Sequence, residues 1–174
     1  MGKSSGLAVF ALLIGVGGIA FGAYSYFIFN DKIAELNSQL KETSVRGTWY
    51  SENLDDWSPT SVNTNETIPL LTITFEVNQG ESVYFLFITR TIIYSNSLQT
   101  FMRFTFRIDG VILNEPFSIA GGYDIDDYYT YIPVALQYST DTLATGSHTV
   151  SVMALKSYSF NFIRQSTLLI QTYV

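Results

Sequence analysis

The chain has 174 residues and a net charge of −6; apolar residues make up 47%, aromatic residues 16% and charged residues 14%, with one His and no Cys. The acidic balance excludes the basic surface with which nucleic-acid-binding proteins meet phosphates, so we expect no nucleic-acid partner. The absence of Cys excludes disulfides and, within one chain, a closed structural zinc site. Ser, Thr, Asn and Tyr supply much of the polarity, which favours an extracytoplasmic surface domain over a cytosolic enzyme.

The first predicted element is a transmembrane helix over residues 7–30, a stretch without charged residues. The 23 residues from Leu7 to Phe29 would rise about 34 Å as a helix, enough to cross a hydrocarbon core of roughly 30 Å. The alternative is a cleaved signal peptide, whose shorter apolar region ends at a small-x-small site such as Ala20-Phe21-Gly22. Because the apolar run continues past that site, we predict that the helix is retained as an anchor.

The charges around this helix predict its direction. Lys3 and the amino terminus precede it, whereas both signs of charge follow it. By the positive-inside rule, residues 1–6 lie in the cytoplasm and the rest of the chain lies outside. The expected protein is therefore a single-pass cell-membrane protein with an extracytoplasmic domain.

One face of the predicted helix carries only small residues, spaced alternately by three and four. They are Ala8, Ala11, Gly15, Gly18, Gly22 and Ser25. Small residues allow two membrane helices to approach closely, so this stripe predicts self-association within the membrane. The alternative is that Gly and Ala are simply frequent in membrane helices.

Residues 31–44 continue with a helical pattern. Ile33, Leu36 and Leu40 recur at spacings of three and four with charged residues between them. Such a short amphipathic segment is not a stable coiled coil alone, but it would serve as a helical stalk if it continues the membrane helix. A solvated juxtamembrane helix is the alternative.

Residues 45–174 are predicted to form one β-rich domain, because the apolar period changes from 3.6 to 2. The run from Leu71 to Val77 alternates apolar residues with Thr and Glu, as a half-buried strand does. The first half of the run 82–94 is apolar on both faces, which predicts a central strand. Asp109-Gly110 lies between two apolar runs and predicts a two-residue hairpin turn.

The remaining pattern completes a mainly-β fold. Pro133 predicts an edge strand or a bulge, and the last strand, which runs to residue 174, is expected to be held within the sheet. The irregular stretch 51–67 is expected to wrap the sandwich, with Trp57 against it. Seven or eight strands without a convincing helix after residue 44 predict an antiparallel β-sandwich or jelly roll behind one long N-terminal transmembrane α-helix.

The end of the chain resembles a known family. The strand "GSHTVSVMAL" from Gly146, followed after a gap by "STLLIQTYV", resembles the end of a TNF/C1q-like jelly roll, where a G-[ST]-H-T-V strand leads to a terminal L-x-[IV] strand. The resemblance covers about the last thirty residues. It implies a jelly roll that trimerises through one sheet face and binds a ligand or receptor without catalysis. TNF ligands also carry one membrane helix before the domain.

The overall layout resembles a second family, the archaeal pilins and archaellins. In those proteins a hydrophobic helix and an amphipathic helix form the filament core, and β-domains form its sheath. "KSSG", residues 3–6, stands where their processing site would be, but Lys3 lies three residues before Gly6 and no Glu follows near the new N-terminus.

The sequence contains no convincing catalytic pattern, and we expect that the protein is not an enzyme. His148 is the only His, no GxSxG elbow is present, and His148 at the start of a strand is expected to be structural or at the surface. Asn65-Glu66-Thr67 is a glycosylation sequon in a polar loop, which agrees with an outside location.

The loop "GGYDIDDYY" combines acidic and aromatic residues. Asp124, Asp126 and Asp127 are hard oxygen donors that suit Ca²⁺, and a solvated acidic loop is the alternative; no other cofactor is expected. Exposed Tyr residues in and near the loop would suit a recognition surface, but a Tyr-rich core or an intersubunit face is the interpretation that we favour. These residues are Phe117, Tyr123, Tyr128, Tyr129 and Tyr131.

Together these patterns predict a membrane-anchored cell-surface β-sandwich protein. We expect it to act in binding, adhesion or surface assembly, as a homo-oligomer, either a trimer or a filament. The expected ligand is an unknown protein or glycan. The alternative is a pilin-like subunit whose N-terminal helices form the core of an extracellular filament.

Overall fold

The structure is a computed structural model that describes residues 44–95, 99–122 and 128–174. The chain divides into two units, Met1–Ser44 and Val45–Val174, and the fold below is that of the second unit. The predicted transmembrane helix, its small-residue stripe, the stalk up to residue 43 and residues 123–127 of the acidic loop lie outside the described residues. In the part that is described, no helix has the length and apolarity needed to cross a bilayer.

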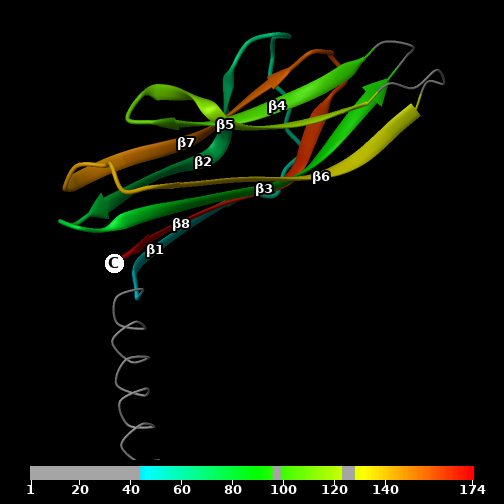
Figure 1. Cartoon of the computed structure of the whole chain (residues 1–174). Helices are drawn as coiled ribbons and strands as arrows, with labels where there is room; N and C mark the ends of the chain where they lie inside the picture. The colour runs from blue at the N-terminus through cyan, green and yellow to red at the C-terminus, as the bar shows by residue number, and fades with distance from the viewer. Residues whose placement is uncertain (1–43, 96–98, 123–127) are drawn as a thin grey trace, which may run out of the picture. The chain divides into compact units, whose positions relative to one another are not determined.

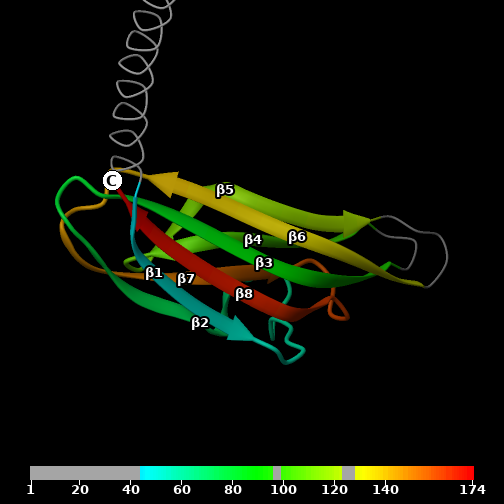
Figure 2. The same ribbon diagram turned by 90° about the horizontal axis from the view of Figure 1, so that it is seen from below.

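The described residues form eight β-strands and no helix. The strands are β1 (Val45–Asn53), β2 (Glu66–Val77), β3 (Ser82–Ser95), β4 (Thr100–Ile108), β5 (Val111–Gly122), β6 (Tyr128–Thr140), β7 (Gly146–Lys156) and β8 (Phe162–Tyr173). They make two four-stranded sheets that lie one above the other, in the orders β1-β8-β3-β6 and β2-β7-β4-β5 (Figure 1). Figure 2 shows the first of these sheets from its outer side.

The strand order is that of a jelly roll. Every strand pair within the two sheets is antiparallel. Of the connections between these strands, only that from β4 to β5 stays within one sheet, and each of the others crosses to the opposite sheet. Eight strands in two sheets with this alternation are the jelly-roll arrangement, so the predicted mainly-β antiparallel fold is confirmed.

The two ends of the sandwich are defined by the strand register. Val45 and Ser82 both pair with Tyr173, at what we call the basal end. At the other end, which we call the distal end, Tyr94 pairs with Tyr129 (right in Figure 1). The starts of β4 and β6 and the turn between β7 and β8 also lie at the distal end.

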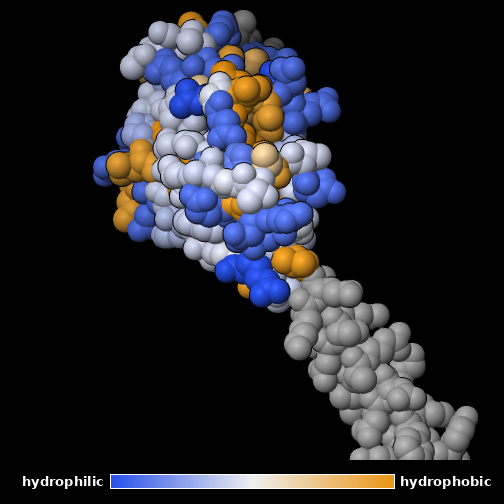
Figure 3. All heavy atoms as spheres, turned by 90° about the vertical axis from the view of Figure 1, so that its left-hand side faces the viewer, coloured by the Kyte–Doolittle hydropathy of each residue, from blue (hydrophilic) through white to orange (hydrophobic). Residues whose placement is uncertain are grey.

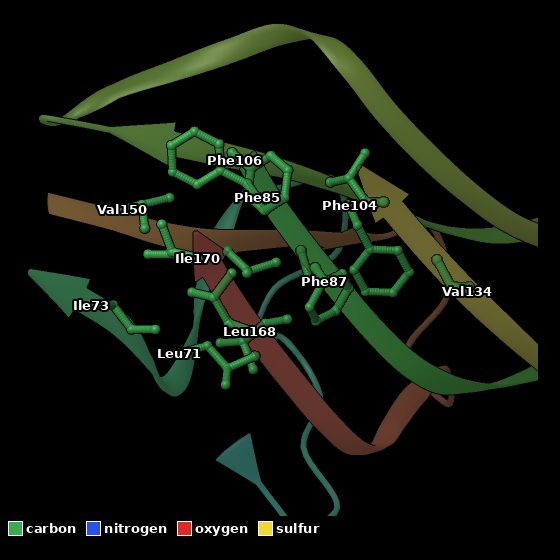
Figure 4. Close-up of a cluster of buried hydrophobic side chains, with 14 of the residues drawn as sticks. Leu71, Ile73, Phe85, Phe87, Phe104, Phe106, Val134, Val150, Leu168 and Ile170 are labelled. Carbon is green, nitrogen blue, oxygen red and sulfur yellow. The ribbon is translucent and has the colours of Figure 1, made fainter. Parts of the chain in front are cut away.

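Phe, Leu, Ile and Val side chains from both sheets fill the core (Figure 4). On β2 the apolar residues from Leu71 to Val77 are buried and the Thr and Glu residues between them are exposed, because successive side chains of a strand point to opposite faces. Phe75 and Phe85 meet edge to face with ring centroids 5.7 Å apart, the orientation that the ring quadrupoles favour. Phe87, Phe104 and Phe106 are also fully buried.

Several local predictions are confirmed. β3 is central between β8 and β6, β8 is held between β1 and β3, and Pro133 lies on the edge strand β6. The Asp109-Gly110 turn has φ of 49° and 82°, the positive values that a type I′ hairpin turn requires. Trp57 packs against the core and forms a bridge with Ile163.

The basal end leaves apolar side chains on the surface in separate patches, bordered by hydrophilic residues (Figure 3). Val45 is 55% exposed and Val111, beside the β4–β5 turn, is 65% exposed. Scattered apolar residues of this kind are ordinary on protein surfaces. The distal end differs, because a group of exposed aromatic side chains there lie in contact with one another.

Candidate binding surface

Asn161, in the turn between β7 and β8, joins the two sheets at the distal end. Its side chain is fully buried; Nδ2 donates to the Phe101 carbonyl of β4 at 3.2 Å, and Oδ1 accepts from the Tyr94 amide of β3 at 2.9 Å. The Asn161 carbonyl also accepts a bond of 2.6 Å from Ser58 Oγ. These bonds fix the turn against both sheets, and the sequence reasoning did not single out Asn161.

Four aromatic side chains gather over this turn, and we call them the distal aromatic cluster: Tyr94, Tyr129, Tyr158 and Phe160. The Tyr94 ring lies at the centre, with centroid distances of 4.9 Å to Tyr129, 5.9 Å to Tyr158 and 5.6 Å to Phe160. Tyr94 and Tyr158 are stacked at 10°, and Phe160 also meets Tyr158 at 5.6 Å. The cluster therefore draws on β3, β6 and the β7–β8 turn.

The outer rings of this cluster are open to solvent. Phe160 is 57% exposed and Tyr129 is 43% exposed, whereas Tyr94 and Tyr158 are half-buried beneath them. Large aromatic side chains contribute most to interface energetics, so rings held in contact yet left exposed are the expected form of a recognition surface.

The aromatic surface continues along the outer face of the sheet. Tyr131 is 60% exposed and pairs with Ile92, which in turn pairs with Phe162. Ile92 is only 1% exposed although it does not belong to the core cluster, because it lies between aromatic neighbours on this outer face. Tyr128, at the start of β6, is 65% exposed.

The core alternative for the predicted aromatic residues is wrong where the structure describes them. Tyr128, Tyr129 and Tyr131 are exposed, because the first residues of the edge strand β6 are open on both faces and burial begins further along, at Val134. Phe117 is also exposed but lies on β5 in the other sheet, so it is not part of the cluster. Tyr123 lies outside the described residues.

The segment between β1 and β2 packs against the start of β8 at the distal end. The Arg164 guanidinium binds the Asp56 carboxylate through two bonds of 2.6 Å, and this arginine lowers the pKa of Asp56. Trp57 and Ile163 exchange two backbone bonds of 3.0 and 2.8 Å. The predicted wrapping is confirmed for residues 54–65, whereas residues 51–53 of the predicted irregular stretch belong to β1 and residues 66–67 belong to β2.

Lys156, at the end of β7, is buried beside the same segment. It is 5% exposed, and its Nζ donates to Ser58 Oγ at 2.8 Å and to the Ser159 carbonyl at 3.2 Å. Glu66 closes the segment by accepting bonds from the Thr60 and Ser61 amides, which lower the pKa of its carboxyl group. These groups hold backbone in place, and none of them is arranged as a nucleophile with a base.

His148 has the structural role that the sequence predicts. Its Nδ1 lies 2.7 Å from Asp109 Oδ2 and its Nε2 lies 2.7 Å from the Ala144 carbonyl. A carboxylate and a carbonyl are both acceptors, so this geometry suits the doubly protonated imidazolium. The hydrogen bond to Asp109 raises the pKa of His148 and lowers that of Asp109. The pair fixes the β4–β5 turn to β7 at the basal end.

The other predicted site residues stay predictions. Asn65 is exposed just before β2, where a glycan would have room. The calcium candidates Asp124, Asp126 and Asp127 lie outside the described residues, and the described part of the chain has no group of three His, Asp or Glu side chains placed to hold a metal.

No family model and no curated protein matches this sequence. Among solved structures, the infectious bursal disease virus Gx strain structure has a chain that is 9% identical, with a TM-score of 0.38, over 72% of this chain and 32% of that chain. The present chain thus spans about a third of that virus chain. The globular domain of zebrafish complement 1qA is 10% identical, with a TM-score of 0.34, over 74% and 97% of the two chains.

A third similar structure is the CBM36-1 domain of a multidomain xylanase from the hindgut metagenome of Trinervitermes trinervoides. It is 12% identical, with a TM-score of 0.33, over 71% of this chain and 96% of that chain. Identities and scores this low assign neither function nor ligand to the present chain. The jelly-roll assignment rests on the strand order described above.

Proposed function

We propose that residues 45–174 form a binding module that contacts its ligand through the distal aromatic cluster. The observation that carries the proposal is the exposure of Phe160 and Tyr129 in a cluster whose rings already touch one another. Burying a side chain as large as Phe is worth about 1.5–3 kcal/mol, so a ligand that covers these rings gains a substantial free energy. Contiguous exposed apolar surface commonly marks an interaction site.

The rigidity of the cluster supports the same function. Tyr94 and Tyr129 are a cross-strand pair, and Asn161 locks the turn that carries Tyr158 and Phe160. Rings held in place before binding lose little conformational entropy when a ligand arrives. The cluster also lies at the end of the sandwich opposite Val45, the first residue of the domain.

The ligand class is a protein or a glycan, and binding proceeds without catalysis. The fluorescently labelled full-length chain in non-ionic detergent is applied to a glycan array and to cells treated with protease or with glycosidases. Loss of cell binding after protease identifies a protein ligand, and loss after glycosidases together with array signals identifies a glycan.

A double variant, Tyr129→Ser with Phe160→Ser, tests whether the cluster makes the contact. Binding falls at least about tenfold if the two rings contribute as interface hot spots do. Tyr50→Ser is the matched control, because Tyr50 is 58% exposed on β1, outside the cluster. Equal binding by the double variant and the control would reject the cluster as the contact surface.

The proposal includes a membrane anchor at residues 7–30, with the domain on the cell surface and oligomers formed through the small-residue stripe. Resistance of the native protein to carbonate extraction supports the anchor, and release into the soluble fraction contradicts it. Gly18→Ile is expected to weaken association in a membrane dimerisation assay, because its larger side chain keeps the helices apart.

The pilin-like alternative uses the same helices as a filament core. Negative-stain images of the cell surface distinguish the two, since filaments that carry this chain favour the alternative. The intact mass of the native protein adds a second criterion, because processing before Leu7 is expected of a pilin and not of a retained anchor.

A further inference from the structure

The start of β6 has a free edge at the distal end. Among the described strands, β6 is the last of its sheet and pairs with β3 alone (Figure 2). The four residues from Tyr128 to Tyr131 are all exposed, so this stretch of strand is open on both faces. Burial begins only further along, at Val134.

The bonds of Tyr94 show which way the backbone groups of Tyr129 point. In an antiparallel pair, two residues directly opposite each other either exchange two hydrogen bonds or both point away from the partner strand. Tyr94 lies opposite Tyr129, but its N–H donates to Asn161 Oδ1 at 2.9 Å and its carbonyl accepts a bond of 2.8 Å from Thr100 Oγ1. The N–H and C=O of Tyr129 therefore point away from β3, toward the free edge.

Two further residues of β6 agree with this direction. The pairing of β3 with β6 runs without a register shift, so every second residue of β6 points the same way. Pro133 has no N–H to give to β3, and the Ala135 carbonyl accepts a bond of 3.0 Å from Ser118 Oγ in the other sheet. Tyr131 follows the same alternation, so its N–H and C=O also face the free edge.

Elsewhere the sandwich protects its edges. On the opposite side, Ser51 Oγ donates to the Leu70 carbonyl at 2.6 Å and Asn53 Nδ2 donates to the Pro69 carbonyl at 3.3 Å, which joins the edge strands β1 and β2. Residues 128–132, Tyr-Tyr-Thr-Tyr-Ile, instead have high strand propensity and contain neither a charge nor a Pro. An unprotected edge of this composition is a template for pairing with another strand.

We propose that this edge pairs with the same edge of a second copy of the chain, antiparallel about a two-fold axis at Thr130. In this register Tyr129 lies opposite Tyr131 of the second copy and exchanges two hydrogen bonds with it. The symmetric pair adds the same two bonds, so the N–H groups of Tyr129 and Tyr131 are matched in both copies. Such an interface is isologous, because both copies use the same patch.

The side chains favour a second copy over an unrelated strand. The sequence Tyr129-Thr130-Tyr131 has the same residue on each side of the axis, so on the outer face each Tyr ring meets a Tyr ring of the other copy. Aromatic pairs of this kind stabilise adjacent strands. On the other face Tyr128, which is 65% exposed, lies opposite Ile132 of the second copy. The absence of charge from 128 to 132 avoids repulsion between copies of a chain whose net charge is −6.

The pairing joins two four-stranded sheets edge to edge and brings two distal aromatic clusters onto one face. An edge of five residues is smaller than a standard interface, so we expect a weak dimer, with a Kd of about 0.1–1 mM. The outer faces of both sheets stay open, and the inference does not rest on the proposed function.

The test uses the absence of Cys from the chain. Thr130→Cys places one thiol of each copy at the two-fold axis, in a non-hydrogen-bonded pair, where Cα atoms lie about 4.5 Å apart, within the range of a disulfide. The full-length variant in non-ionic detergent is oxidised with copper–phenanthroline and air. It is expected to form disulfide dimers at least about tenfold faster than Thr48→Cys, the matched control, which is exposed on the edge strand β1.

A second pair of variants tests the backbone bonds. In the Thr130→Cys background, Tyr131→Val removes the ring, whereas Tyr131→Pro removes the ring and the N–H that faces the edge. The Pro variant is expected to form disulfide dimers at least about threefold more slowly than the Val variant. A measurement without substitution supports it if Tyr131→Pro does not fold: the Tyr129 and Tyr131 amides are expected to exchange hydrogen more slowly as the protein concentration rises from about 0.05 to 2 mM.

Three results would overturn the inference: equal dimer formation by Thr130→Cys and Thr48→Cys, equal rates for the Pro and Val variants, or amide exchange that does not depend on concentration. Phe160→Ser separates this inference from the proposed function. It removes a ring of the distal aromatic cluster but no group of the edge, so it is expected to leave dimer formation by Thr130→Cys unchanged.

Discussion

Raising the pH from 5.5 to 8.5 is expected to destabilise the domain through His148. This side chain is held between Asp109 Oδ2 and the Ala144 carbonyl, and the bond to Asp109 raises its pKa above the ordinary value of 6.5. A group whose pKa is raised by folding stabilises the folded state fully below its unfolded-state pKa. That contribution is lost as the pH rises through the native pKa.

Asp109 behaves in the opposite sense. The hydrogen bonds from His148 and from the Thr149 amide lower its pKa below the ordinary value of 3.8. Its contribution is therefore present above pH 3.8 and is lost as the pH falls through the native pKa. The pair is thus most stabilising between the two ordinary values, 3.8 and 6.5.

The size of the effect follows from the exposure of the two partners. The His148 side chain is 11% exposed and that of Asp109 is 46% exposed. A pair that is half open to solvent lies between an exposed ion pair, worth about 0.2–1 kcal/mol, and a charge-assisted bond, worth about 1.5–3 kcal/mol. We expect about 1 kcal/mol, which lowers the Tm by about 4 °C in a domain of this size.

The assay uses features that are unique to this domain. Both Trp residues of the chain, Trp49 and Trp57, pack against its core, so Trp fluorescence reports the unfolding of residues 45–174 within the full-length protein. His148 is the only His and Cys is absent, so no other side chain has an ordinary pKa between 6 and 8. The α-amino group is the one other group that titrates in this range. The native pKa can be read directly from the single His resonance by NMR.

His148→Gln is the control variant, because Gln cannot titrate. Its stability is expected to be nearly constant between pH 6 and 8.5, whereas the parent protein weakens over the same range. A native pKa at or below 6.5, or the same pH dependence in His148→Gln, would refute the role assigned to this pair.

Three further predictions concern the core and the distal end. Asn161→Ala is expected to cost about 1–3 kcal/mol in urea unfolding, because it removes the acceptor of the Tyr94 amide, whereas the Phe101 carbonyl keeps its bonds from Ser157; a loss below about 0.5 kcal/mol would contradict this. Phe87→Ala is expected to cost about 3–5 kcal/mol, since the ring is fully buried against Phe104, and an exposed-site control such as Tyr50→Ala is expected to change stability by less than about 1 kcal/mol. Deletion of residues 167–174 is expected to abolish the cooperative Trp fluorescence transition, because these residues form the part of β8 that lies between β1 and β3; a surviving transition would show that the strand is dispensable.

The local elements could be predicted because their signals are local. The alternation from Leu71 to Val77 identifies β2, and Asp109-Gly110 identifies the β4–β5 turn. Both features follow from the geometry of a few adjacent residues, the two-residue period of a strand and the positive φ of a type I′ turn.

The strand order and the aromatic cluster depend instead on residues far apart in the sequence. β1, the first strand of the domain, pairs with β8, the last. Tyr94, Tyr129 and Phe160 meet only because the end of β3, the start of β6 and the β7–β8 turn lie at the same end of the sandwich. The two-residue period of a strand also fails to predict the burial of Tyr128–Tyr131, because both faces of the edge strand are open to solvent there. Asn161 gave no signal, since a buried Asn in a turn looks like any turn residue until its partners are known.

The most direct test of the binding proposal is the ratio of two affinities for cell surfaces. The Tyr129→Ser, Phe160→Ser double variant and the Tyr50→Ser control are measured side by side as full-length proteins, after the cooperative Trp fluorescence transition of each confirms folding. We expect the double variant to bind at least about tenfold more weakly than the control. Equal affinities would contradict the claim that the distal aromatic cluster is the surface with which this protein meets its ligand.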